Sequence, residues 1–230
     1  MTISTLSGLG DAVYAYPIVK EFSIRGPVNL YTRYREVFAD LPNITYIEKP
    51  AGIRLAYSRA KNENFYESMC KAVGANIDLV GSAHRGVWAE LHPAIMGGKE
   101  LCIIKEPCTA DMHKKTRDFS MSARPKAMQD FIDANKDRYY FMSIDGGEVY
   151  RERLSGIDAH LKGLTVQEYL AWCAMASAFV TQIGHLVPIA QWLGRRLYLF
   201  EPENNTAHNT RHVTVDSVIV KGFTDYEVYS

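Results

Sequence analysis

A glycine-rich turn near the start of the chain carries an acidic side chain that could do chemistry. The stretch "LSGLGDAV" places Gly8 and Gly10 just before Asp11, between a β-rich run and a helical run. Glycines in such a turn let the backbone and a ligand approach closely. One use of such a turn is to place Asp11 as a general base at the mouth of a cleft between two lobes. The alternative is structural, with Asp11 capping the helix that Ala12 begins.

The same turn has to be compared with the dinucleotide-binding fingerprint G-x-G-x-x-G. Val13 stands where that fingerprint has its third glycine. The next strand ends near Thr32 and Arg33, where an NAD-binding protein would show an acid for the ribose hydroxyls. Arg33 instead keeps open an NADP-dependent oxidoreductase as a second hypothesis.

The elements that position these residues alternate between β-rich and helical runs, which predicts a parallel α/β architecture. The predicted strands cover 2–6, 27–34, 43–49, 53–59, 101–107, 139–147, 179–183 and 196–202. The predicted helices cover 12–22, 35–41, 63–73, 126–136, 165–178 and 185–193. Thr165 and Glu168 have the spacing of a capping box, and Gly74 is suited to end a helix.

The paired glycines Gly97 and Gly98 indicate a boundary between two lobes. We therefore expect an N-terminal lobe over residues 1–98 and a C-terminal lobe over 99–230. The expected fold is two Rossmann-like lobes, with mostly parallel sheets, that face each other across a central cleft. Arg151 and Arg153 are interpreted as surface helix residues.

Composition narrows the function classes. With 47% hydrophobic and 23% charged residues, the chain is an ordinary globular protein rather than a disordered or fibrous one. Its 26 basic residues equal its 26 acidic ones, so it lacks the overall basic excess of a protein that binds nucleic acid by charge alone. Its four cysteines form no metal-binding or disulfide pattern, which predicts reduced thiols. No membrane span or secretory signal is recognised, so a cytoplasmic location is expected.

Several stretches resemble the family 9 glycosyltransferases, the heptosyltransferase-like group. "LSGLGDAVYAYPIVKEF" is similar to that family's first strand, its G-x-G-D turn and a helix containing proline. "TRYREVFADLPNITYIEK" and "YYFMSIDGGE" are similar to later segments. The stretch from Leu161 to Pro202 looks like the family's donor-side helices and strand end. Together these stretches cover most of the chain in the family's order.

The resemblance implies a GT-B fold and an inverting, metal-independent glycosyltransferase that needs no cofactor. The nucleotide-sugar donor would bind the C-terminal lobe, and the acceptor would come from the N-terminal lobe. Asp11 falls on the family's aspartate, which is taken to deprotonate the acceptor hydroxyl. Gly8, Gly10 and Arg33 would then lie on the acceptor side.

The chain departs from the family pattern in its second half. Gln182, Ile183 and Pro188 replace the family's asparagine, aspartate and histidine, and the chain is shorter than typical members. These departures indicate a shortened form, divergent or phage-type. They also keep open a third hypothesis, a non-catalytic protein that binds nucleotide sugars.

Glycosyl transfer releases a nucleoside diphosphate, whose charge cations or helix N-termini must stabilise where no Asp-x-Asp metal motif exists. Lys114, Lys115 and Arg117 follow the first strand of the second lobe, at the end of the sheet where such folds bind ligands. We expect one of the lysines to contact the diphosphate and Thr109 to donate a hydroxyl. The alternative is a solvated basic loop.

Three further residues are predicted to bind the donor. Gly184 and His185 precede a helix, so their backbone N–H groups could point at a phosphate, although His185 could instead cap that helix. Glu201 leaves a strand at the cleft edge and could accept hydrogen bonds from ribose hydroxyls.

Two acceptors remain open. One is a saccharide of the cell envelope, as the family resemblance suggests. The other is a hydroxymethylated base in DNA, whose phosphates would meet arginines of the N-terminal lobe. These are Arg25, Arg33, Arg35, Arg54 and Arg59.

Overall fold

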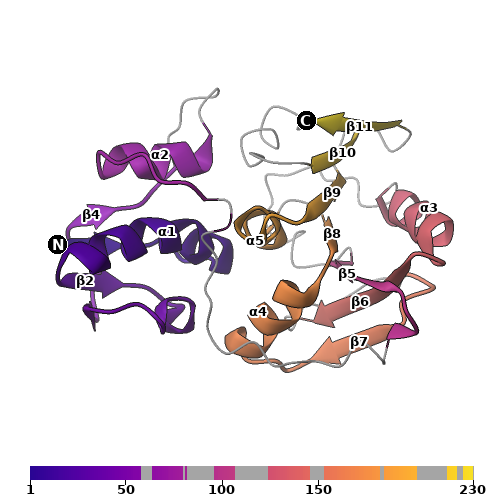
Figure 1. Cartoon of the computed structure of the whole chain (residues 1–230), viewed down its shortest axis with the longest axis horizontal. Helices are drawn as coiled ribbons and strands as arrows, with labels where there is room; N and C mark the ends of the chain where they lie inside the picture. Colours follow the sequence, from indigo (N-terminus) through magenta and orange to yellow (C-terminus); the bar gives the residue numbers. More distant parts are fainter. Residues whose placement is uncertain are drawn as a thin grey trace, which may run out of the picture.

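The structure is a computed structural model of the whole chain. It describes residues 1–57, 64–79, 81, 96–106, 124–145, 153–181, 184–200, 217–221 and 225–229. Its strands form two separate sheets, one near each end of the molecule, with helices between and around them (Figure 1). No helix among these residues is long and apolar enough to cross a membrane.

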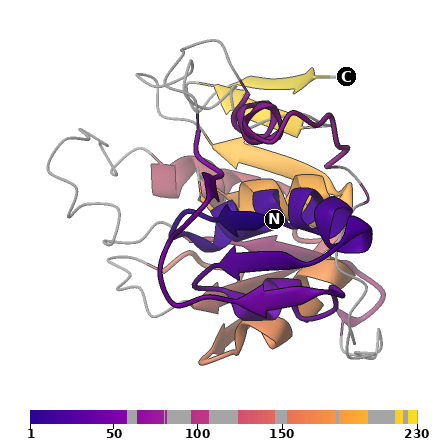
Figure 2. The ribbon, with the colours of Figure 1, turned by 90° about the vertical axis from the view of Figure 1, so that its left-hand side faces the viewer.

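The N-terminal sheet is parallel and has the order β3-β2-β1-β4. Its strands are β1 (Thr2–Ser4), β2 (Val28–Tyr31), β3 (Ile44–Tyr46) and β4 (Ile53–Arg54). Figure 2 shows them side by side and running in one direction. Since Ile3, Leu30 and Ile53 are register partners, they share one face of the sheet, and Ile3 and Leu30 are fully buried.

Helix α1 (Leu9–Arg25) is central to the molecule and begins three residues before the predicted start at Ala12. Every residue from Ala12 to Val19 is buried, because the β2 region, α2, η1 and α5 all contact this helix. Tertiary packing therefore buries this part of the helix on all sides, whereas Ile24 and Arg25 in its last turn are exposed. Pro17 lies inside the helix and provides no N–H for the carbonyl of Val13.

Two shorter helical elements accompany α1. They are the 3-10 helix η1 (Arg35–Phe38) and α2 (Phe65–Ala72). Asn64 caps α2 by accepting a hydrogen bond from the Tyr66 backbone N–H, at 2.8 Å. Gly74 has a positive φ of 67° after this helix, which confirms the predicted helix end.

The C-terminal sheet has seven strands in the order β11-β10-β9-β8-β5-β6-β7, all parallel except the edge pair β10 and β11. The bounds are β5 (Glu100–Ile104), β6 (Tyr139–Asp145), β7 (Ala159–Lys162), β8 (Ala178–Thr181), β9 (Arg196–Phe200), β10 (Ser217–Lys221) and β11 (Asp225–Tyr229). The predicted parallel α/β class is therefore confirmed. The strands β7, β10 and β11 were not predicted.

Helices cover both faces of this sheet. One face packs on α3 (Arg124–Asn135), with Phe131 against Phe141, Tyr198 and Phe200. The other packs on α4 (Val166–Met175) and α5 (Leu186–Leu193). The predicted capping box at Thr165 and Glu168 is present at the start of α4.

The two sheets share one apolar core, because α1 packs directly against α5. The Tyr16 and Trp192 rings meet edge to face at 5.1 Å, and the buried Gln191 amide donates to the Tyr14 hydroxyl at 3.3 Å. Figure 1 shows these helices next to each other between the sheets. The lobes are thus joined by a hydrophobic interface. Gly97 and Gly98 have positive φ values between the sheets, and the division at residue 98 stays a prediction.

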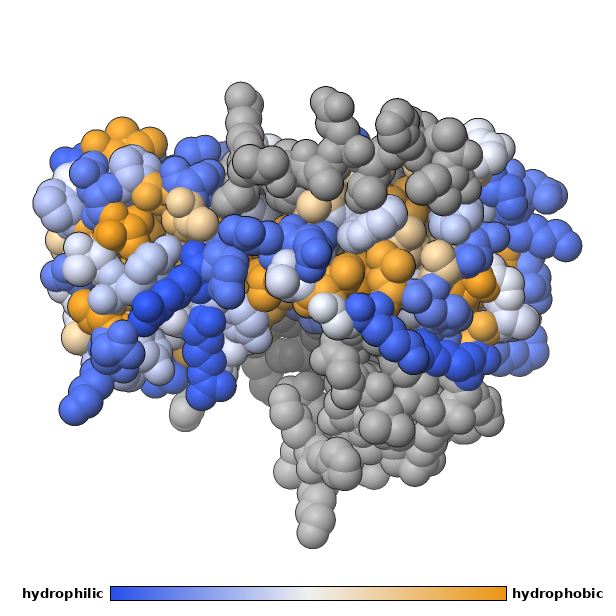
Figure 3. Space-filling view, turned by 90° about the horizontal axis from the view of Figure 1, so that it is seen from below, coloured by the Kyte–Doolittle hydropathy of each residue, from blue (hydrophilic) through white to orange (hydrophobic). Residues whose placement is uncertain are grey.

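Seen from below, hydrophilic residues cover much of the coloured surface and hydrophobic ones form small groups among them (Figure 3). Three cysteines, Cys70, Cys102 and Cys173, are free thiols inside the protein. Burial raises the pKa of each thiol, which keeps it protonated and unreactive. Cys108 lies outside the described residues.

Candidate functional site

A cavity of about 340 Å³ lies where the two lobes meet. Its apolar lining consists of Leu9, Ile103, Ile104, Ile144, Leu164, Val166 and Leu186. Its polar lining consists of Tyr34, Lys105, Thr165, Tyr169 and His185. Leu9 and Tyr34 come from the N-terminal lobe and the others from the C-terminal lobe. A few polar groups on a mainly apolar wall are typical of a small-molecule site.

The cavity lies at the switch point of the C-terminal sheet. From β5 the chain continues to β6 and β7, and then returns to β8 on the other side of β5. Lys105 directly follows β5, and His185 follows β8 by a few residues. Ligands of open α/β sheets bind at such a point, beyond the carboxyl ends of the strands. The position of the cavity therefore follows from the topology.

His185 forms part of the cavity wall at the start of α5. Its Nε2 is 2.8 Å from the Tyr169 hydroxyl. Loss of hydration on burial, with repulsion from Lys105, lowers the pKa of His185 to about 3. The imidazole is therefore neutral at physiological pH. Gly184 also lies at the start of α5, and the donor contacts predicted for both residues stay predictions.

Asp11 lies in the first turn of α1, and both its carboxylate oxygens have partners. The Gly8 backbone N–H donates to Oδ2 at 2.9 Å, and the Tyr57 hydroxyl donates to Oδ1. Burial raises the pKa of Asp11, while the bond from Gly8 opposes the rise. The carboxylate does cap the N-terminus of the helix. It does so from the third helical residue, by accepting from the Gly8 N–H, and not from the position before Ala12 that the structural alternative gave it. Asp11 is not among the cavity-lining residues, although Leu9 is.

The glycines of the turn are close to protein atoms. A Cβ on Gly10 would lie 3.1 Å from Pro188 Cγ and 3.2 Å from His185 Cα. A Cβ on Gly8 would lie 2.9 Å from Asp11 Oδ2. The structure gives these glycines a packing role, since Gly10 admits helix α5 and Gly8 admits the Asp11 carboxylate. Their predicted place on the acceptor side stays a prediction.

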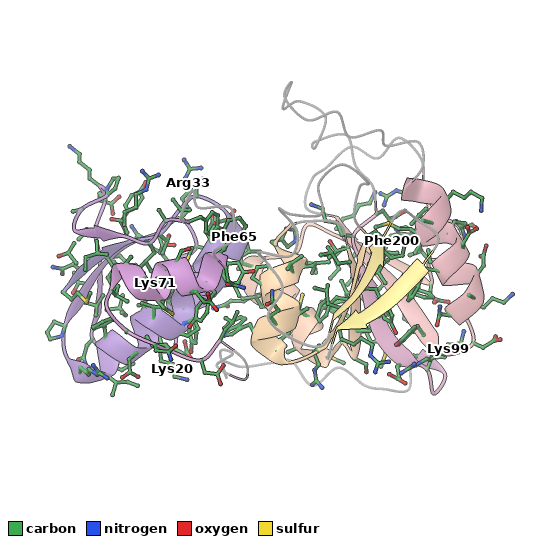
Figure 4. The ribbon with its side chains drawn as sticks, turned by 90° about the horizontal axis from the view of Figure 1, so that it is seen from above. Lys20, Arg33, Phe65, Lys71, Lys99 and Phe200 are labelled. Carbon is green, nitrogen blue, oxygen red and sulfur yellow. The ribbon has the colours of Figure 1, made fainter. Side chains whose placement is uncertain are left out.

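Arg33 is exposed, and Figure 4 shows its side chain pointing outward from the edge of the N-terminal lobe. It does not line the cavity, whereas its neighbour Tyr34 does. The residue on which the NADP hypothesis rests is therefore outside the described cavity. Arg25 and Arg35, from the same basic series, form ion pairs with Glu21 and Glu48.

Five predicted donor-binding residues, Thr109, Lys114, Lys115, Arg117 and Glu201, lie outside the described residues. The cation that the structure does place at the cavity is Lys105, at the end of β5. Sequence reasoning also missed Tyr34, Tyr57 and Tyr169. Their only sequence signal is position. Tyr34 is the last residue of one predicted strand, Tyr57 lies within another, and Tyr169 lies one helical turn after Thr165.

A buried carboxylate lies beyond the end of β5. The Glu106 side chain is fully buried and accepts hydrogen bonds from Arg153 Nη1 at 2.8 Å and the Leu154 backbone N–H at 2.9 Å. His160 Nδ1 is 3.4 Å from the same carboxylate. Arg153 is exposed, as predicted, but it lies in no helix. Arg151 lies outside the described residues. Arg153 neutralises Glu106 and so holds two segments of the C-terminal lobe together.

No protein-family model matches the chain, and no match was found among curated protein sequences. Solved structures do match. The iron-containing dodecameric glycosyltransferase TibC from enterotoxigenic E. coli is 17% identical with a TM-score of 0.61, over 87% of this chain and 57% of TibC. This chain thus spans just over half of TibC.

Two other solved structures are similar. A family 9 glycosyl transferase from Veillonella parvula has a TM-score of 0.61 at 9% identity, over 96% of this chain and 85% of its own. E. coli heptosyltransferase WaaC, bound to ADP-2-deoxy-2-fluoro heptose, has a TM-score of 0.57 at 10% identity, over 87% of this chain and 89% of its own.

These likenesses show the fold. The chain has the GT-B architecture of the heptosyltransferase-like family 9 glycosyltransferases, which confirms the predicted fold and resemblance. Among the residues that the structure describes, no group of three or more His, Cys, Asp or Glu side chains is arranged to hold a metal ion. Metal independence of any reaction stays a prediction.

Proposed function

We propose that the protein is an inverting, metal-independent glycosyltransferase that moves a sugar from a nucleotide-sugar donor to an acceptor hydroxyl. The observation that carries this proposal is the position of the cavity. It lies at the switch point of the C-terminal sheet and beside the start of α1, in a fold shared with heptosyltransferases. Leu9, two residues before Asp11, lines this cavity, so a donor bound there would lie close to the start of the helix that carries the base.

The donor would bind the C-terminal lobe with its diphosphate near Lys105 and the start of α5. A cation and backbone N–H groups at a helix N-terminus both stabilise the negative charge that develops on a leaving diphosphate. The neutral His185, bonded to Tyr169, adds a polar group without adding charge. The apolar wall would pack against the less polar surface of the donor.

Asp11 would act as the general base. The acceptor O–H proton passes to the carboxylate, and the acceptor oxygen forms a bond to the anomeric carbon. The bond between that carbon and the diphosphate oxygen breaks on the opposite face, which inverts the configuration. Burial supports this role, because it raises the pKa of Asp11 and so makes the carboxylate a stronger base.

For the acceptor, a saccharide of the cell envelope is favoured over a hydroxymethylated base in DNA. Two of the five arginines considered for a DNA-contacting face, Arg25 and Arg35, are paired with acidic residues. Paired arginines contribute less to phosphate binding than unpaired ones, because the acidic partner must first be displaced.

The test is a transfer assay read by mass spectrometry. Donors would be ADP-, UDP- and GDP-sugars, with ADP-linked heptose first, and acceptors would be simple glycans and hydroxymethylated DNA. NADPH in a parallel binding measurement tests the oxidoreductase hypothesis. Donor binding without transfer to any acceptor would favour the non-catalytic alternative.

Asp11→Asn is expected to lower turnover at least about 100-fold with donor affinity unchanged, because general base catalysis contributes that much or more. Asp40→Asn is the matched control, since Asp40 bonds to Tyr16 away from the cavity lining. Full turnover by Asp11→Asn would refute the assignment of the base.

A further inference from the structure

Two hydrogen-bond donors hold the Asp11 carboxylate, the Gly8 backbone N–H and the Tyr57 hydroxyl. Tyr57 comes from a distant part of the sequence. Tyr57 lies three residues beyond the end of β4, and α1 begins five residues after the end of β1. Strands β1 and β4 are parallel neighbours, with Ser4 opposite Arg54. Their carboxyl ends therefore share one edge of the sheet, which brings the phenol to the first turn of α1.

The Tyr57 ring is itself fixed by an aromatic neighbour. Its centroid is 4.3 Å from that of Phe65, with the planes tilted by 38°. Phe65 is 4% exposed and is the first residue of α2. Figure 4 shows Phe65 at the end of α2 nearer the C-terminal lobe, with Lys71 toward the other end. The cap of α2 by Asn64 thus also fixes the ring against which Tyr57 packs.

We propose that Tyr57 is a positioning residue for Asp11, and that its hydroxyl orients the carboxylate and favours its ionised form. This inference rests on the proposed function, in which Asp11 accepts the acceptor proton. A carboxylate oxygen has a second lone pair, so Oδ1 and Oδ2 can each bond to the protein and still meet an acceptor hydroxyl. Tyr57 opposes the effect of burial, because a hydrogen bond to the charged form stabilises it.

Several other titratable groups lie near Asp11, and none of the contacts described for them involves the Tyr57 hydroxyl. On α1, Tyr14 feels the charge of Asp11, and from α2 Tyr66 packs against the Tyr14 ring. From α5, His185 adjoins Gly10 and is neutral, with Lys105 beyond it. After η1, Asp40 is bonded to Tyr16 at 2.7 Å. A changed Asp11 titration in Tyr57→Phe would therefore report the lost hydroxyl.

The experiment is a carboxyl carbon-13 NMR titration of the full chain, with Asp11→Asn used to identify the Asp11 signal. Tyr57→Phe keeps the ring on Phe65 and is expected to raise the pKa of Asp11 by about one unit. Tyr46→Phe is the matched control from the same lobe. Its hydroxyl donates to the Arg35 carbonyl at 3.1 Å, so its loss should leave Asp11 unchanged.

An unchanged or lowered Asp11 pKa in folded Tyr57→Phe would overturn the proposal. If that variant does not fold, Phe65→Leu decides, because it releases the ring while keeping the hydroxyl. A smaller upward shift in Phe65→Leu supports the proposal, and no shift overturns it. The titration needs no substrate, so its result is independent of the transfer assay. Normal transfer by Asp11→Asn would refute the base and leave the Tyr57 contact standing.

Discussion

At the scale of single residues, the His185 side chain in the cavity wall makes the stability of the fold depend on pH. Its pKa of about 3 in the folded protein is below its ordinary value of 6.5. Between these values the unfolded chain binds a proton that the folded protein does not. The linked stability is therefore fully present above pH 6.5 and is lost as the pH falls toward 3.

His185→Gln removes this titration and keeps a polar side chain near Tyr169. Between pH 7 and pH 5, the free energy of unfolding of the wild type should fall by about 1 to 2 kcal/mol more than that of the variant. Urea unfolding at both pH values measures this difference. Parallel losses in the two proteins would show that His185 is not held neutral.

Glu106 presents a second residue-scale prediction, since its buried charge depends on Arg153. Arg153→Ala leaves the carboxylate without its cation and should lower the free energy of unfolding by about 2 kcal/mol. The value is below that for a wholly buried pair because the Arg153 side chain is 37% exposed. Arg25→Ala, which breaks an exposed pair with Glu21, is the control and should change stability by less than about 0.5 kcal/mol. Equal effects of the two variants would contradict the argument.

At the scale of elements, the packing of α1 on α5 sets the geometry of the site. Gly10 permits this approach, because a Cβ there would press on Pro188 and on the His185 backbone. Alanine would gain helix propensity over glycine, but a backbone neighbour yields less easily than the end of a flexible side chain. The steric cost of the added Cβ should therefore exceed the gain in helix propensity.

Gly10→Ala is expected to lower the free energy of unfolding by about 1 kcal/mol. Gly26→Ala, at the other end of α1, is the matched control, since a Cβ there meets nothing within 4 Å. Chemical denaturation of both variants checks the comparison. A stabilised Gly10→Ala variant would show that α5 moves away at little cost.

At the scale of the whole molecule, the shared core implies that the two lobes unfold together. Trp192 is fully buried on α5 and its ring contacts Tyr16 of α1, so its side chain packs across the interface between the lobes. Trp192→Ala should lower the free energy of unfolding by about 3 to 5 kcal/mol. Hydrogen exchange should show protection lost together in β2 and β9. Loss confined to β9 would mean that the lobes unfold independently.

The sequence by itself determined the local elements and their class. Alternating β-rich and helical runs, the Thr165 capping box and the glycine after α2 all depend on neighbouring residues, so their patterns can be read directly. Most strands and helices were predicted within a few residues. The likeness to a glycosyltransferase family was also visible in the order of the motifs.

Only the tertiary structure decided which residues meet. Asp11 and Tyr57 are joined through the pairing of β1 with β4, and Gly10 is close to α5 through the packing of the lobes. The cavity and its residues Tyr34, Lys105 and Tyr169 depend on how the chain returns from β7 to β8. Such contacts join positions far apart in sequence, and the residues themselves carry no local pattern that indicates their partners. The burial of residues 12–19 in α1 has the same cause, since β2, α2 and η1 of the N-terminal lobe and α5 of the C-terminal lobe all contact this helix.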